Sequence, residues 1–100
     1  MVEIRWTEKA SNNLEDIFEY IASDSKIYAS RFIKAIIKQT SILENQPLSG
    51  RIVPEFNDPE IRELIYRNYR IVYSVIDDNT IKILVVYHGA VNFNNITIDE

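Results

Sequence analysis

Residues 61–88 have the sequence IRELIYRNYRIVYSVIDDNTIKILVVYH, which is rich in β-branched and aromatic side chains. Such side chains favour extended backbone, so the segment predicts three strands, at residues 61–66, 69–76 and 80–88. Arg67-Asn68 and Asp78-Asn79 lie between them as short turns, and each turn contains an asparagine, which tolerates positive φ. The three strands are therefore expected to form an antiparallel meander.

Two helices and an opening strand are predicted before this meander. Residues 2–6 alternate between apolar and charged side chains, the pattern of a half-buried strand. Thr7 is a suitable N-cap for a helix at residues 8–22, where apolar side chains recur at helical spacing. After the turn residues 23–25, a second amphipathic stripe continues to Leu43. The two helices are expected to form a hairpin.

The segment between the helices and the meander is predicted to be a loop, because Pro47, Gly50, Pro54 and Pro59 interrupt it. The order β-α-α-β-β-β then predicts an α+β fold. In it, an N-terminal strand and a two-helix hairpin pack on a three- to four-stranded antiparallel sheet. Residues 1–100 form a single domain, and residues 90–100 are not assigned to an element.

Both faces of the predicted sheet are largely apolar. With the register set by two-residue turns, one face carries Arg62, Leu64, Tyr66, Tyr69, Ile71, Tyr73, Leu84, Val86 and His88. The other face carries Ile61, Glu63, Ile65, Arg70, Val72, Ile76, Ile81, Ile83, Val85 and Tyr87. Since two helices cover only one face well, the second is expected to receive a partner segment or the chain's own residues 90–100.

Composition excludes several classes of function. The chain has 46% hydrophobic and 26% charged residues, the balance of a globular protein, and no cysteine, which excludes disulfides and thiolate metal sites. No phosphate-binding glycine loop, paired-carboxylate motif or metal-ligand cluster is present, so no cofactor and no metal are expected. No signal peptide or membrane-spanning run is found, and a cytoplasmic protein is expected. The net charge of −4 argues against strong direct binding to nucleic acid.

The sequence LENQPLSGRIVPE at residues 43–55, with Arg62-Glu-Leu64 and Tyr69-Arg-Ile-Val-Tyr73, resembles the ParE branch of the ParE/RelE toxins. Trp6 before the first helix and Val86-Tyr-His-Gly89 after the last strand fit the same family, so the resemblance spans nearly the whole chain. It implies the toxin of a type II toxin–antitoxin system, with a sheet curved around a helical hairpin. It also implies a cognate antitoxin whose disordered C-terminal segment wraps the toxin and folds on binding.

The resemblance leaves two targets open. ParE-type toxins poison DNA gyrase, whereas RelE-type relatives cut mRNA on the ribosome. A nuclease needs several cationic groups at the phosphate, with a general acid and base. Residues 71–100 contain four acids and one lysine, a local charge of −3 that repels RNA. The sequence therefore favours a gyrase poison that acts by binding, over an mRNA endonuclease or an inactive, partner-binding family member.

The candidate site residues follow from these alternatives. If the protein is a nuclease, the catalytic groups are Arg62, Arg70 and His88; otherwise His88 only ends a strand. Glu63 and Arg70 are expected to form a structural ion pair across the first hairpin of the meander. Partner contacts are predicted at Arg51, Glu55, Arg62, Tyr66, Tyr69 and Tyr73. Alternatively, Arg51 and Glu55, which flank Pro54, order the loop, and the three tyrosines are core contacts.

The second helix contains the most basic stretch of the chain. Arg31, Lys34 and Lys38 fall on one face at helical spacing, and no acid occurs in this helix before Glu44. This stripe is interpreted either as a solvated face or as a contact for DNA, an acidic antitoxin or an acidic surface of the target.

Overall fold

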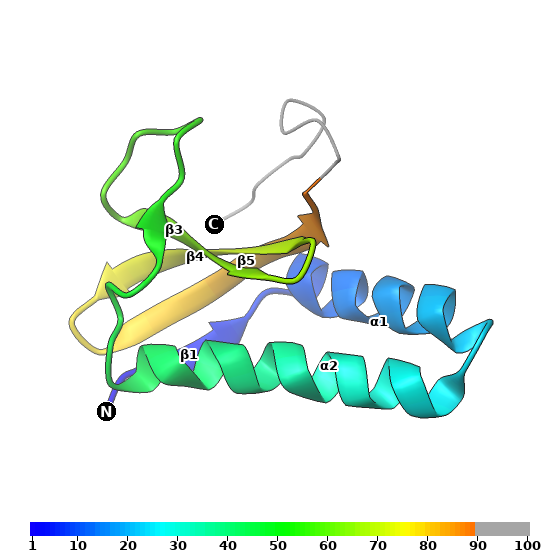
Figure 1. Ribbon diagram of the computed structural model, residues 1–100. Helices are drawn as coiled ribbons and strands as arrows, with labels where there is room; N and C mark the ends of the chain where they lie inside the picture. The colour runs from blue at the N-terminus through cyan, green and yellow to red at the C-terminus, as the bar shows by residue number, and fades with distance from the viewer. Residues whose placement is uncertain (90–100) are drawn as a thin grey trace.

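The computed structural model describes residues 1–89, in which a helical hairpin lies against one face of a five-stranded sheet (Figure 1). The strand order is β1-β5-β4-β3-β2. The elements are β1 (Glu3–Trp6), α1 (Glu8–Ala22), α2 (Lys26–Ser41), the 3₁₀ helix η1 (Ile42–Glu44), β2 (Arg51–Ile52), β3 (Ile61–Tyr66), β4 (Tyr69–Asp77) and β5 (Thr80–His88). The predicted α+β fold is confirmed, and the structure assigns one more strand than the prediction allowed.

Hydroxyl groups begin both helices where the sequence predicts them. The Thr7 side chain accepts a hydrogen bond from the backbone N–H of Ala10, and the Ser25 side chain accepts one from Tyr28. Each hydroxyl satisfies a helical N–H that has no partner within the helix. Helix α1 has the predicted bounds, and η1 carries the end of the second helix to Glu44.

The sheet differs from the predicted antiparallel one at both of its edges. Strand β1 pairs in parallel with β5, from which the two helices and strands β2, β3 and β4 separate it in the chain. Strand β2, within the predicted loop, pairs Arg51 with Glu63 and Ile52 with Arg62. A strand of two residues between a glycine and a proline is too short to show an alternating pattern.

A β-bulge at Leu84 changes which side chains share a face. Val72 pairs with Val85 and Tyr73 pairs with Ile83, so Leu84 has no counterpart in β4. An extra residue in one strand shifts the alternation by one position. The predicted faces are therefore wrong for part of β5: Ile83, with Ile81 before it, packs in the core beneath the helices, and Leu84 packs on the opposite side.

The first turn of the meander uses a different residue from the one expected. Tyr66 pairs with Tyr69, and the left-handed residue between them is Arg67, with a φ of 56°, rather than Asn68. At the second turn the N–H of Asn79 donates to the Asp77 carboxylate over 2.8 Å. Both turns connect the strands that the sequence predicts.

Most apolar side chains in the middle of the second sheet face are buried, whereas Ile65 is 55% exposed. Val72, Leu84, Val85 and Tyr87 form a second core cluster with Val53, and each is 7% exposed or less. The middle of this face is therefore buried, and Ile65 leaves an exposed apolar position beside it. The predicted role of residues 90–100 in covering it lies outside the described residues. Within the described part of the chain, no helix has the length and apolar character that a membrane crossing requires.

Candidate functional site

Four charged side chains form a network on the face of the sheet opposite the helices. At its centre is Glu63, whose side chain is 0% exposed. Its carboxylate accepts hydrogen bonds from Nε of Arg51, over 2.6 Å, and from Nε of Arg70. Glu55 accepts two more from Arg70, over 3.0 and 3.1 Å. The predicted pair of Glu63 with Arg70 is confirmed, and two further charges from β2 and its following loop join it.

The network determines the charge state of its exposed carboxylate. The hydrogen bonds from Arg70 lower the pKa of Glu55 below its ordinary value, and the nearby charges of Arg70 and Arg51 add to this effect. Arg70 also lies over the ring of Tyr87, with its Cζ 5.5 Å from the ring centroid. Burial raises the pKa of Tyr87 to about 12.

This raised pKa predicts a loss of stability in alkali. The Tyr87 hydroxyl, with an ordinary pKa of 10.0, keeps its proton in the folded chain while the unfolded chain releases it. The stability that the protonated Tyr87 hydroxyl contributes is thus complete below pH 10 and is lost as the pH rises toward 12. A shift of one pKa unit corresponds to about 1.4 kcal/mol, so we expect Tyr87→Phe to reduce this loss by about 1–3 kcal/mol. Urea unfolding of both proteins at pH 8 and pH 11.5 measures the difference, and parallel losses would contradict it.

Two of the predicted partner contacts hold the loop before β3 in place. Arg62 donates to the carbonyl oxygens of Gly50, over 3.0 Å, and Pro59, over 2.9 Å. The Tyr73 hydroxyl donates to the Pro47 carbonyl over 2.8 Å and accepts from the Gly50 N–H over 3.0 Å. Tyr73 is 0% exposed, so in this structure it stabilises the loop and presents no surface to a partner.

The other predicted tyrosines lie in a row of aromatic rings between α2 and the sheet. Phe32 contacts Tyr66 and Tyr69, with ring centroids 5.6 and 5.5 Å apart, and Tyr69 meets His88 edge-on at 5.3 Å. At the α2 end of the row, Tyr28 lies 6.1 Å from Phe32. Tyr66 and Tyr69 are half-buried, so each has surface left for a partner.

The three residues predicted for a nuclease do not come together. A hollow of about 410 Å³ is lined by Arg70 and His88, but Arg62 does not line it. Arg70 donates to Glu55 and Glu63, and Arg62 donates to backbone carbonyls. The remaining residues around the hollow are Arg51, Ile65, Arg67, Asn68 and Gly89. Residues 1–89 contain no group of three or more histidine, cysteine or acidic side chains placed to hold a metal ion.

The family of the chain follows from its sequence. The model of the ParE toxin family, of the parDE type II toxin–antitoxin systems, matches residues 4–93. The chain belongs to this ParE toxin family. The match includes both helices, the charge network and the loop that Arg62 and Tyr73 hold. No curated protein matches the chain.

Solved structures of similar fold also come from toxin–antitoxin systems. A chain of the chromosomal ParDE system from P. aeruginosa superposes with a TM-score of 0.71 at 23% identity, covering 88% of this chain and 96% of that one. A chain of the RelBE2 toxin–antitoxin complex from Mycobacterium tuberculosis gives a TM-score of 0.64 at 22% identity, covering 87% and 96%. At these identities the likeness shows the ParE/RelE fold alone.

The connections between the 45–60 loop and the sheet were not predicted from the sequence. Gly50 was expected only as a chain breaker, and Arg51 and Glu55 were expected to order the loop or to contact a partner rather than to bind Glu63 and Arg70. A buried position for Glu63 between apolar neighbours of β3 indicates that charged partners must exist. It does not indicate which cations of the loop supply them.

Proposed function

We propose that this ParE-family toxin acts in the cytoplasm by inhibiting DNA gyrase through binding, and that a cognate antitoxin neutralises it. The gyrase target is supported by the hydrogen-bond partners of two arginines in the sheet, Arg62 and Arg70. Arg62 and Arg70 donate to loop carbonyls and to two carboxylates, so they are committed to the fold and do not meet at one phosphate site. A nuclease relies on such groups to stabilise the charge that develops at phosphorus. A toxin that traps its target by contact does not require them.

An antitoxin partner is supported by the family and by the exposed part of the candidate site. Two solved structures of similar fold are from toxin–antitoxin systems. Arg51, with 57% of its side chain exposed, and Glu55, with 37%, offer charged contacts, and Tyr66 and Tyr69 offer aromatic ones. Co-expression with the product of the neighbouring gene tests this part: the two proteins should co-elute, and growth should recover.

Expression in a bacterial host tests the target. A gyrase poison should produce double-strand DNA breaks and an SOS response while mRNA stays intact, and the purified protein should inhibit supercoiling by gyrase. Cleaved mRNA with intact DNA would overturn the proposal in favour of a ribosome-dependent endonuclease. Normal growth would indicate a family member that only binds its partner.

His88 provides a test within the protein. It is exposed at the end of β5 and packs its ring against Tyr69, while the adjacent Arg70 is engaged with two carboxylates. We therefore expect His88→Ala to arrest growth as the unchanged toxin does. Thermal unfolding shows whether the variant is folded, and loss of toxicity in a folded variant would favour the nuclease.

A further inference from the structure

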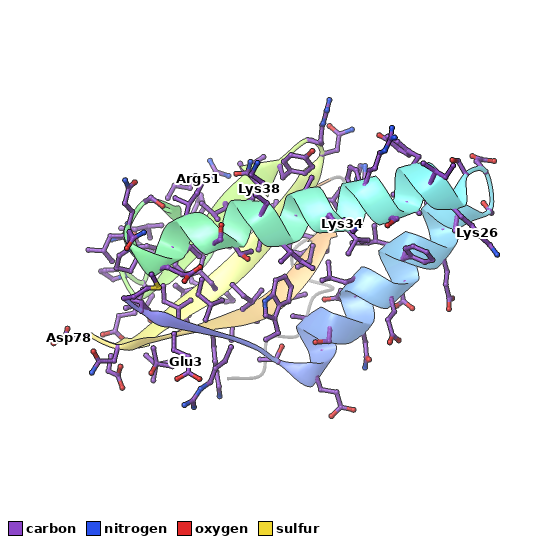
Figure 2. The ribbon with its side chains drawn as sticks, turned by 90° about the horizontal axis from the view of Figure 1, so that it is seen from below. Glu3, Lys26, Lys34, Lys38, Arg51 and Asp78 are labelled. Atoms are coloured by element: carbon purple, nitrogen blue, oxygen red, sulfur yellow. The ribbon has the colours of Figure 1, made fainter. Side chains whose placement is uncertain are left out.

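The outer surface of α2 carries a concentration of positive charge on an otherwise acidic protein. Helix α2 contains four basic residues and no acid, whereas α1 contains four acids and one lysine. Arg31, Lys34 and Lys38 are exposed, and within residues 1–89 none of them forms an ion pair. Figure 2 shows Lys26, Lys34 and Lys38 along this helix. The acids of α1 therefore do not neutralise the stripe.

Apolar side chains lie at both ends of the same stripe. Ile27 is 69% exposed and precedes Arg31 by four residues, and Ile42 is 45% exposed and follows Lys38 by four residues. A spacing of three or four residues places all of them on one side of the helix. The stripe thus combines unpaired cations with exposed apolar groups, which a partner that is both acidic and apolar would complement.

A hollow at the N-terminal half of α2 extends this surface onto the sheet. It measures about 230 Å³ and is lined by Tyr28, Arg31, Phe32, Tyr66 and Arg67. No acidic side chain lines it, and Arg67 lies over the Tyr66 ring with its Cζ 5.7 Å from the centroid. Tyrosine and arginine are the residues that dominate binding energy at protein interfaces. The hollow can therefore receive a large apolar side chain that has carboxylates beside it.

We propose that the α2 stripe (Ile27, Arg31, Lys34, Lys38 and Ile42) and the adjoining hollow bind an acidic amphipathic helical segment of a protein partner. Carboxylates of the segment pair with the three cations, while its apolar side chains cover the isoleucines and fill the hollow. The assignment of the segment to the antitoxin rests on the proposed function. The acidic and amphipathic character of the segment is inferred from the stripe and the hollow alone.

Nucleic acid fits the surface less well. An extended polyanion would reach beyond the stripe onto a chain with a net charge of −4. Phosphates also leave Ile27 and Ile42 uncovered, whereas a protein helix buries them. A short acidic segment matches both the size and the mixed character of the patch.

Matched charge reversals test the stripe in the toxin–antitoxin complex. Lys34→Glu places a carboxylate at the centre of the stripe, and we expect it to weaken partner binding by about 10-fold or more. Lys26→Glu makes the same change of net charge on another side of the helix, in its first turn, where an acid is favourable, and should weaken binding less than about 3-fold. Isothermal titration calorimetry measures both, and equal effects would overturn the assignment of the site.

A model ligand tests the chemistry without the antitoxin. We expect a synthetic amphipathic helix of leucine and glutamate to shift the NMR amide signals of Arg31, Lys34 and Lys38, and Lys34→Glu to suppress these shifts. The leucine–lysine counterpart should leave those signals in place. Equal shifts from both peptides, or tighter binding of a single-stranded oligonucleotide at α2, would overturn the proposal. If gyrase proves unaffected while the acidic peptide still binds α2, the proposed function fails and this inference stands.

Discussion

Replacing Glu63 by alanine is expected to lower the free energy of unfolding by about 3–5 kcal/mol, the usual cost of removing one member of a buried ion pair. The Glu63 carboxylate is 0% exposed and accepts hydrogen bonds from both Arg51 and Arg70. Without it, the Arg70 side chain, 13% exposed, loses a buried acidic partner and is left with the partly exposed Glu55. Domains of this size have stabilities of about 5–15 kcal/mol, so the variant should lose a large fraction of its stability and unfold at a lower temperature.

Glu55→Ala is the matched control for this experiment. Glu55 binds the same arginine with two hydrogen bonds, yet its side chain is 37% exposed and water can replace it. Exposed pairs contribute about 0–1 kcal/mol, so the control should remain close to the unchanged protein. Urea unfolding followed by circular dichroism measures both variants. Similar losses for Glu63→Ala and Glu55→Ala would show that burial does not determine the strength of the network.

The local parts of this fold could be predicted from sequence because each depends on residues close in the chain. The Thr7 cap and the turn residues 23–25 predict where the helices begin, and the β-branched and aromatic content of residues 61–88 predicts three strands. The Glu63 and Arg70 pair was predictable because both residues lie in one hairpin. These elements have the predicted type and nearly the predicted bounds.

The remaining parts depend on contacts between distant residues. The bulge at Leu84 leaves no trace in a run of apolar side chains, since every residue from Ile83 to Val86 suits either face. The parallel pairing of β1 with β5 joins the start of the chain to its last strand. Arg51 and Glu55 bind Glu63 and Arg70, which are distant from them in the chain, and the sequence therefore did not predict these two ion pairs.

Replacing Gly50 by alanine is expected to destabilise the protein by about 3 kcal/mol, because a methyl group has no room there. An added Cβ would lie 2.6 Å from the Tyr73 hydroxyl oxygen and 2.7 Å from the backbone carbonyl oxygen of Glu63. Overpacking of this kind costs about 1–3 kcal/mol. A displaced Tyr73 also leaves the Pro47 carbonyl without its hydrogen bond, which adds about 1 kcal/mol. Urea unfolding measures the change.

Two variants separate the steric cause of this loss from other causes. Ser49→Ala alters an exposed neighbour in the same loop and should change stability by less than about 0.5 kcal/mol. Adding Tyr73→Phe to Gly50→Ala removes the closest contact, but a methyl at position 50 would still meet the Glu63 carbonyl and the Tyr73 ring carbon Cε1, each at 2.7 Å. The double variant should therefore recover little stability. Full recovery would mean that the hydroxyl contact alone excludes alanine, and that the backbone of β3 can yield to the loop.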